Sequence, residues 1–196
     1  MIPQYNGSKS EKATSYAPLP AGGYVAKICG ARIENYSWGS VLVIAFDICE
    51  GEHTGFFQEQ FDNNTNDDKK WKGTYRITIP DERSEYFSSQ KRSFNNLIYA
   101  LENSNGNYHF DWDEKKLKGL TIGVLFRNKE WEWNGKTGWT TECCAVTDAD
   151  EIREESFTIP KDKPLANHAA AAAATGTGAG NNPGFDTITD DDDLPF

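Results

Sequence analysis

The densest mixture of basic and aromatic side chains in this chain of 196 residues lies between residues 69 and 76. It consists of Lys69, Lys70, Trp71, Lys72, Tyr75 and Arg76. Aromatic rings stack on flat faces, and cations pair with anionic groups. A single-stranded nucleic acid offers both kinds of partner, as bases and as phosphates. We therefore predict that Trp71 and Tyr75 stack on bases and that the neighbouring cations bind phosphates.

Two other sets of residues combine the same chemistry. The larger set comprises Arg127, Lys129, Trp131, Trp133, Lys136 and Trp139, and the smaller one is Tyr36 with Trp38. For every ring the alternative is packing in the core or against a neighbouring strand. Glu130 and Glu132 have the opposite parity to Trp131 and Trp133, so the sequence leaves open which face of that strand is exposed.

Catalytic chemistry finds little support in the sequence. His53, His109 and His168 have no metal-ligand or nucleophile spacing around them, and no glycine-rich phosphate loop follows a strand. The four cysteines are Cys29, Cys49, Cys143 and Cys144, and none forms a C-x-x-C pair. We predict that they are small buried hydrophobic residues in a reducing compartment. The chain is accordingly predicted not to be an enzyme and to need no metal or cofactor.

The elements that would position these residues follow from hydrophobic periodicity. Strands are predicted at residues 24–34, 41–49 and 55–61, and a helix at 84–102 whose apolar residues fall on one stripe. The segments 120–133 and 137–147 then form a hairpin around the turn Asn134-Gly135. Three strands, a helix and a hairpin are the chain order of the OB-fold. We predict a mainly β protein, a five-stranded barrel with the helix between strands 3 and 4. Another small α+β domain has the same order.

The last seven residues combine an acidic run with an apolar end. They are Asp190, Asp191, Asp192, Asp193, Leu194, Pro195 and Phe196. This segment resembles the acidic C-terminal tip of bacterial single-stranded DNA-binding protein. The resemblance implies that the tip recruits DNA replication, recombination and repair proteins. A solubilising acidic tail is the alternative.

The body carries a second and looser resemblance. Its motifs are Leu-Pro-Ala-Gly-Gly-Tyr at residues 19–24, Phe-Asp-Ile within 42–51, and the aromatic segment 56–61. Over roughly residues 19–150 the chain is similar to phage-encoded proteins identified as OB-fold single-stranded DNA-binding proteins. The resemblance implies the fold and a role in bacteriophage DNA metabolism, but no particular site residues.

Composition divides the chain into four parts. Residues 1–20 are predicted to be an irregular arm, 21–158 the OB-fold domain, 159–189 a disordered linker rich in alanine and glycine, and 190–196 the partner-binding tip. The sequence has neither a signal peptide nor an apolar run near the ~20 residues of a membrane span. We predict a cytoplasmic protein, in the bacterial host if it is phage-encoded, without membrane partners.

Charge keeps a rival hypothesis open. The formal net charge is -10 at pH 7, so a DNA-binding surface must be a local basic stripe. The rival is a protein-interaction module that binds no DNA and either mimics DNA or competes for the pockets that accept the tip. The sequence does not fix the oligomeric state, and a homo-oligomer remains open.

Overall fold

The structure is a computed structural model that describes residues 18–65 and 67–166. The chain forms one compact unit up to Lys163, and a second unit spans Pro164–Phe196. Leu19 is only 2% exposed and belongs to the core. At the other end, the N–H of Lys163 donates to the carbonyl of Asn128. The first unit thus includes both Leu19 and Lys163, and the predicted tip at 190–196 lies outside the described residues.

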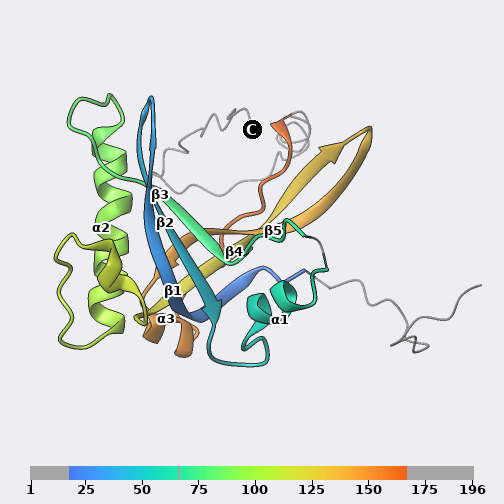
Figure 1. Cartoon of the computed structure of the whole chain (residues 1–196), viewed down its shortest axis with the longest axis horizontal. Helices are drawn as coiled ribbons and strands as arrows, with labels where there is room; N and C mark the ends of the chain where they lie inside the picture. Colours follow the sequence, from blue (N-terminus) through green and yellow to red (C-terminus); the bar gives the residue numbers. More distant parts are fainter. Residues whose placement is uncertain (1–17, 66, 167–196) are drawn as a thin grey trace, which may run out of the picture. The chain divides into compact units, whose positions relative to one another are not determined.

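Five strands form one antiparallel sheet (Figure 1). They are β1 (Gly22–Tyr36), β2 (Gly39–Ile48), β3 (Thr74–Thr78), β4 (Thr121–Trp133) and β5 (Lys136–Thr147). Their order across the sheet is β3-β2-β1-β4-β5. Cα atoms of the edge strands β3 and β5 approach within 8 Å, but no backbone ladder joins them in the described part of the chain. The prediction of a mainly β fold with five strands is confirmed, and the sheet is not closed by hydrogen bonds.

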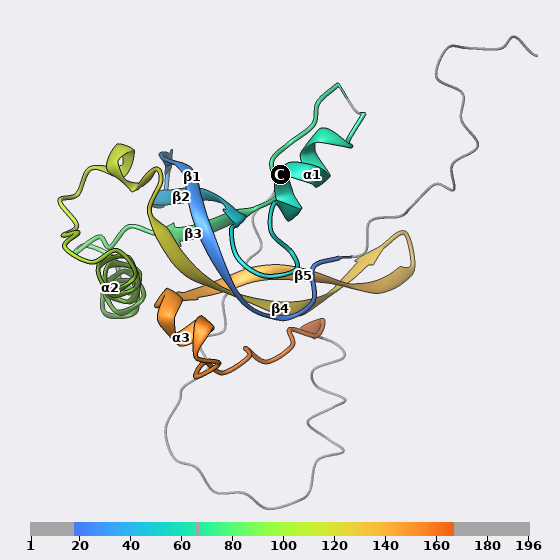
Figure 2. The same cartoon turned by 90° about the horizontal axis from the view of Figure 1, so that it is seen from below.

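The helices differ from the prediction in number. The described residues contain α1 (Phe56–Asp62), α2 (Phe87–Ser104), α3 (Ala149–Arg153) and a short 3-10 helix at Glu114–Leu117. Of these, α2 corresponds to the helix predicted at 84–102, and it does lie between the third and fourth strands. Its buried residues Phe94, Leu97 and Leu101 belong to the predicted apolar stripe. The helix packs against β3, β4 and β5 at one end of the curved sheet (Figure 2).

The prediction of a strand at residues 55–61 is wrong, because this segment forms the helix α1. Its first turn is capped by a side chain of the preceding strand. The carboxylate of Asp47, in β2, accepts hydrogen bonds from the backbone N–H groups of Phe57 at 2.9 Å and Gln58 at 3.1 Å. These N–H groups have no partner inside a helix, and a carboxylate at a helix start is favourable. The third strand is instead β3, at Thr74–Thr78.

The core surrounds β2, which is buried on both faces. Leu42, Ile44 and Phe46 point to one face, and Val41 and Val43 to the other; all are at most 5% exposed. Phe46 is completely buried and meets two other rings edge to face, Phe57 at 5.7 Å and Phe126 at 6.2 Å. These rings come from β2, α1 and β4 and connect the three elements.

The β1–β2 and β4–β5 hairpins are joined by β1 and β4 at one end and separate toward their turns. Residues 22–27 of β1 pair with residues 121–126 of β4. The remainder of each strand pairs with its own hairpin partner, and β4 additionally forms a bridge with Lys163. The β1–β2 and β4–β5 turns consequently form two separate projections (Figure 1). Asn134 and Gly135 have φ values of 50° and 71°, the left-handed geometry of the predicted tight turn.

Candidate nucleic-acid interface

The basic and aromatic residues between 69 and 76 separate onto two sides of the chain. Trp71 and Tyr75 pack against the core, while Lys72 and Arg76 are exposed. The indole N–H of Trp71 donates to the backbone carbonyls of Phe46 and Gly73, both at 3.0 Å. Burial raises the pKa of the Tyr75 hydroxyl, and the nearby thiols of β5 add to the shift. The alternation of the extended chain thus turns the rings inward and the cations outward.

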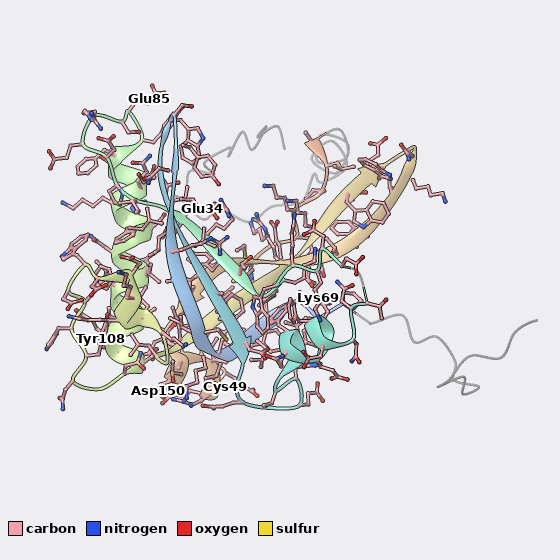
Figure 3. The ribbon with its side chains drawn as sticks, in the orientation of Figure 1. Glu34, Cys49, Lys69, Glu85, Tyr108 and Asp150 are labelled. Atoms are coloured by element: carbon pink, nitrogen blue, oxygen red, sulfur yellow. The ribbon has the colours of Figure 1, made fainter. Side chains whose placement is uncertain are left out.

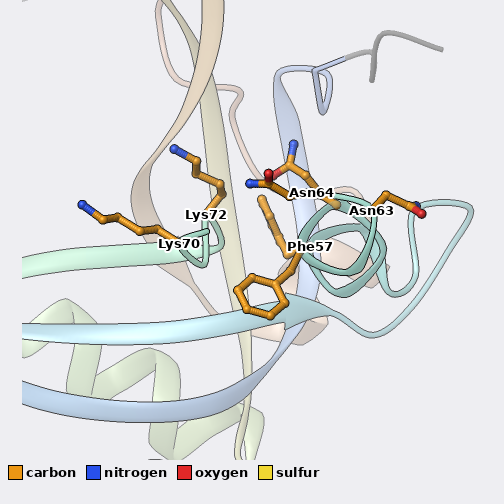
Figure 4. Close-up of a pocket in the computed structure, with 7 residues that line it drawn as sticks. Phe57, Asn63, Asn64, Lys70 and Lys72 are labelled. Carbon is orange, nitrogen blue, oxygen red and sulfur yellow. The ribbon is translucent and has the colours of Figure 1, made fainter. Parts of the chain in front are cut away.

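A pocket of about 290 Å³ lies beside this segment (Figure 4). It is lined by Phe57, Gln60, Phe61, Asn63, Asn64, Lys70 and Lys72. Lys69 lies next to it, with its Nζ 4.5 Å from the centre of the Phe61 ring. Figure 4 shows the Lys70 and Lys72 side chains extending side by side from one segment. The pocket combines aromatic rings, amides and cations at the point where the chain enters β3.

Tyr36 and Trp38 form an exposed aromatic pair at the β1–β2 turn. Their rings lie 5.2 Å apart and are within 7° of parallel. Tyr36 is 42% and Trp38 50% exposed, so the pair offers a flat apolar surface to solvent. A surface of this kind can accept a stacked base.

A network of charged groups supports the aromatic pair. Glu34, labelled in Figure 3, lies at its centre. Its Oε2 accepts hydrogen bonds from the Tyr36 hydroxyl at 2.5 Å and from Arg76 Nη2 at 2.7 Å. Its Oε1 accepts from Arg32 Nη2, also at 2.7 Å. Arg76 additionally donates to the Tyr36 hydroxyl at 2.7 Å. The network fixes Arg76 of β3 beside the aromatic pair of the β1–β2 turn.

The network predicts how stability depends on pH. Hydrogen bonds from Tyr36, Arg76 and Arg32 lower the pKa of Glu34 from 4.5 to about 2. A carboxylate with a lowered pKa stabilises the fold above its ordinary pKa and loses this contribution as the pH falls toward the folded value. We expect the stability difference between the wild type and Glu34→Gln to shrink as the pH falls from 4.5 to 2. Urea unfolding of both proteins at neutral and acidic pH measures this, and a difference independent of pH would contradict it.

The β4–β5 hairpin places its basic and aromatic residues on one face. Arg127, Lys129, Trp131 and Trp133 have one parity on β4, and Lys136 lies directly opposite Trp133. The Trp131 ring lies over Gly138, where a Cβ atom would come within 2.6 Å of the indole. Trp131 is 40% and Trp133 72% exposed. Exposed rings and cations therefore share this face.

Trp139 is the exception among the predicted residues of this hairpin. It is 52% exposed, but it pairs with Glu130 and so has the opposite parity to Trp131 and Trp133. The structure brings the other five residues together and leaves Trp139 on the opposite face.

A second carboxylate bridges two cations at the base of this hairpin. Glu142 accepts from Arg127 Nη2 at 2.7 Å, and its other oxygen lies 3.0 Å from Lys129 Nζ. Burial raises the pKa of Glu142, but the hydrogen bonds from Lys129 and Arg127 outweigh burial and lower it. Glu34 and Glu142 thus each bridge two cations, Arg32 with Arg76 in one case and Arg127 with Lys129 in the other.

The cysteines offer no activated nucleophile. Loss of solvation raises the pKa of all four thiols, most strongly that of Cys143, which keeps them protonated near neutral pH. Cys29 is exposed at a bulge of β1, so its predicted burial is wrong, and the other three cysteines are half-buried. Within residues 18–65 and 67–166, no three His, Cys, Asp or Glu side chains are grouped so that they could hold a metal ion.

Sequence reasoning missed three residues of the candidate interface: Arg32, Glu34 and Glu142. The signal for the first two was available, because Arg32, Glu34 and Tyr36 alternate along one strand and must share a face. Their link to Arg76 joins positions 42 residues apart. It depends on the pairing of β1, β2 and β3, which the sequence did not specify.

In the comparison with known proteins, no family model and no curated protein matches the chain. Among the described helices, none has both the length and the apolar character required to cross a membrane.

Proposed function

We propose that this protein binds single-stranded DNA without sequence preference, in the replication or recombination of a bacteriophage genome. The observation that carries the proposal is the aromatic pair Tyr36 and Trp38 held beside Arg76 and Arg32. Rings that stack on bases and cations that follow phosphates are the two requirements for binding single strands. Trp131 and Trp133, with Arg127, Lys129 and Lys136, repeat the combination on the other hairpin.

We further propose that the sheet is an OB-fold barrel. The strand order, the approach of β3 to β5 and the position of α2 at one end of the sheet support this fold. OB-folds bind oligonucleotides on the face of strands 2 and 3 and with the loops that follow strands 1 and 4. Arg76 lies on β3, in the first of these regions, and the two exposed aromatic sets lie in or next to the turns that follow β1 and β4.

The site residues carried forward differ in part from the sequence-based choice. Trp71 and Tyr75 pack against the core, so we assign base stacking to Tyr36, Trp38, Trp131 and Trp133. Lys69, Lys70, Lys72 and Arg76 remain candidates for phosphate contacts, because all four are exposed.

The tip at residues 190–196 is proposed to recruit DNA replication, recombination and repair proteins to the bound strand. Four aspartates suit a basic rim, and Leu194 and Phe196 suit an apolar pocket in a partner. Residues 161–196 carry six aspartates and only two lysines, so this part of the chain contributes nothing to DNA affinity by charge.

A fluorescence-anisotropy titration of labelled oligo-dT tests the DNA-binding proposal. We expect tight, salt-sensitive binding to the single strand, quenching of tryptophan fluorescence, and much weaker binding to a duplex of equal length. Deletion of residues 190–196 should leave a protein that still binds the strand. Absence of binding at low salt would refute the proposal and favour the protein-interaction module that the net charge of -10 suggests.

A further inference from the structure

The outer faces of β1 and β3 hold two guanidinium groups on opposite sides of one carboxylate. Arg32 reaches Oε1 of Glu34 through both Nε, at 3.0 Å, and Nη2, at 2.7 Å, while Arg76 reaches Oε2. The side chains of Arg32 and Arg76 are 62% and 47% exposed, and that of Glu34 is 25% exposed. The two cations are therefore accessible from solvent, and the anion between them is the most enclosed of the three.

A phosphodiester has the same recognition chemistry as this carboxylate. Each presents two anionic oxygens, and guanidinium groups bind both kinds of anion through paired N–H donors. A phosphate placed between Arg32 and Arg76 would accept the hydrogen bonds that Glu34 accepts now. Glu34 and a phosphate would compete for the same donors.

The neighbouring rings extend this site to the size of one nucleotide. The Tyr36 hydroxyl takes part in the network, and its ring stacks on Trp38. A base on the exposed aromatic pair would place its own phosphate near Arg76, since that guanidinium already contacts the Tyr36 hydroxyl at 2.7 Å. Base and phosphate would then be bound by adjacent groups of β1, β3 and the β1–β2 turn.

We propose that Arg32 and Arg76 form a phosphodiester subsite that Glu34 occupies in the free protein. The inference rests on the proposed function and adds to it Arg32 as a phosphate ligand and Glu34 as an internal competitor. In the free protein Glu34 keeps the two guanidinium groups in position and neutralises part of their charge. A bound strand takes over these hydrogen bonds, and Glu34 withdraws from them.

The substitution Glu34→Gln tests the subsite. It removes the competing charge and keeps the shape of the side chain, so we expect oligo-dT to bind about tenfold more tightly at low salt. The plot of log affinity against log salt should become steeper by about 0.7 to 1.4, because one or two further cations pair with phosphates. In a protein that already carries Arg76→Gln, the substitution Glu34→Gln should increase the affinity for oligo-dT by a smaller factor.

The matched control is Glu50→Gln, which makes the same change in net charge. Glu50 is also paired with an arginine, at 2.5 Å from Arg153, and that arginine contacts Asp150 as well. In Figure 3 Asp150 lies at the bottom of the molecule, well away from Glu34. We expect Glu50→Gln to leave affinity and salt dependence close to those of the wild type.

The outcomes separate this inference from the proposed function. If the wild type binds oligo-dT and Glu34→Gln binds equally or more weakly with an unchanged salt dependence, Glu34 only positions its neighbours and the subsite is refuted. The same conclusion holds if Glu50→Gln tightens binding as much as Glu34→Gln. If the wild type binds no single strand, the proposed function and the subsite fail together.

Discussion

Replacing Trp38 and Trp133 together with alanine should weaken oligo-dT binding by about 2 to 6 kcal/mol, at about 1 to 3 kcal/mol for each stacking ring. The two rings are 50% and 72% exposed and lie on different hairpins. Because both are at the surface, their removal should leave the fold intact. Anisotropy titration measures the loss, and the thermal unfolding midpoint should change little.

Trp112 provides a matched control for this double substitution. It is 70% exposed and stacks on Phe94, with ring centres 5.9 Å apart, in the loop that follows α2. Trp112→Ala removes an equally exposed ring from outside the proposed interface, so we expect affinity to remain unchanged. If Trp112→Ala weakens binding as much as the double variant, the loss is not specific to the two hairpins and the proposed interface is wrong.

Phe46→Ala should destabilise the protein by about 3 to 5 kcal/mol, the usual cost of removing a buried phenylalanine ring. Phe46 is completely buried and packs on Phe57 and Phe126, and its backbone N–H donates to the carbonyl of Gly73 at 2.8 Å. The cavity would therefore open where β2, α1, β4 and the entry to β3 meet. Urea unfolding followed by circular dichroism measures the change.

Phe46→Leu is the comparison for this variant. Leucine fills most of the same volume, so its cost should be well below that of alanine. A loss below about 1 kcal/mol for Phe46→Ala would contradict the packing described here. Any loss of DNA binding in either variant must be measured below its unfolding transition, since an unfolded β3 no longer presents Arg76.

Local patterns in the sequence predicted much of the fold. The stripe of Phe94, Leu97 and Leu101 indicated α2, and Asn134-Gly135 indicated the β4–β5 turn. Both signals depend on residues close together in the chain. The helix at residues 56–62 was missed because its N–H groups are capped by Asp47, nine residues before its start. A cap from another element leaves no local signal.

Prediction of the candidate interface was likewise limited to what residues close together in the chain reveal. Composition identified Trp71 and Tyr75, but only the packing of the segment against Phe46 reveals that these rings face the core. Exposure of Trp38 and Trp133 likewise depends on where the hairpins end. The bridge from Glu34 to Arg76 required the strand register, which short-range patterns do not contain.

The pairing of Lys163 with β4 has a consequence for self-association. Beyond residue 126, β4 no longer pairs with β1, which would leave its N–H and C=O groups open to another chain. The N–H of Lys163 donates to the carbonyl of Asn128 at 2.8 Å, and the carbonyl of Lys163 accepts from the N–H of Glu130 at 2.9 Å. This single-residue bridge occupies the open edge of β4 where β4 leaves β1. Covering an edge in this way disfavours pairing with a second chain, here at the base of the hairpin that carries Trp131 and Trp133.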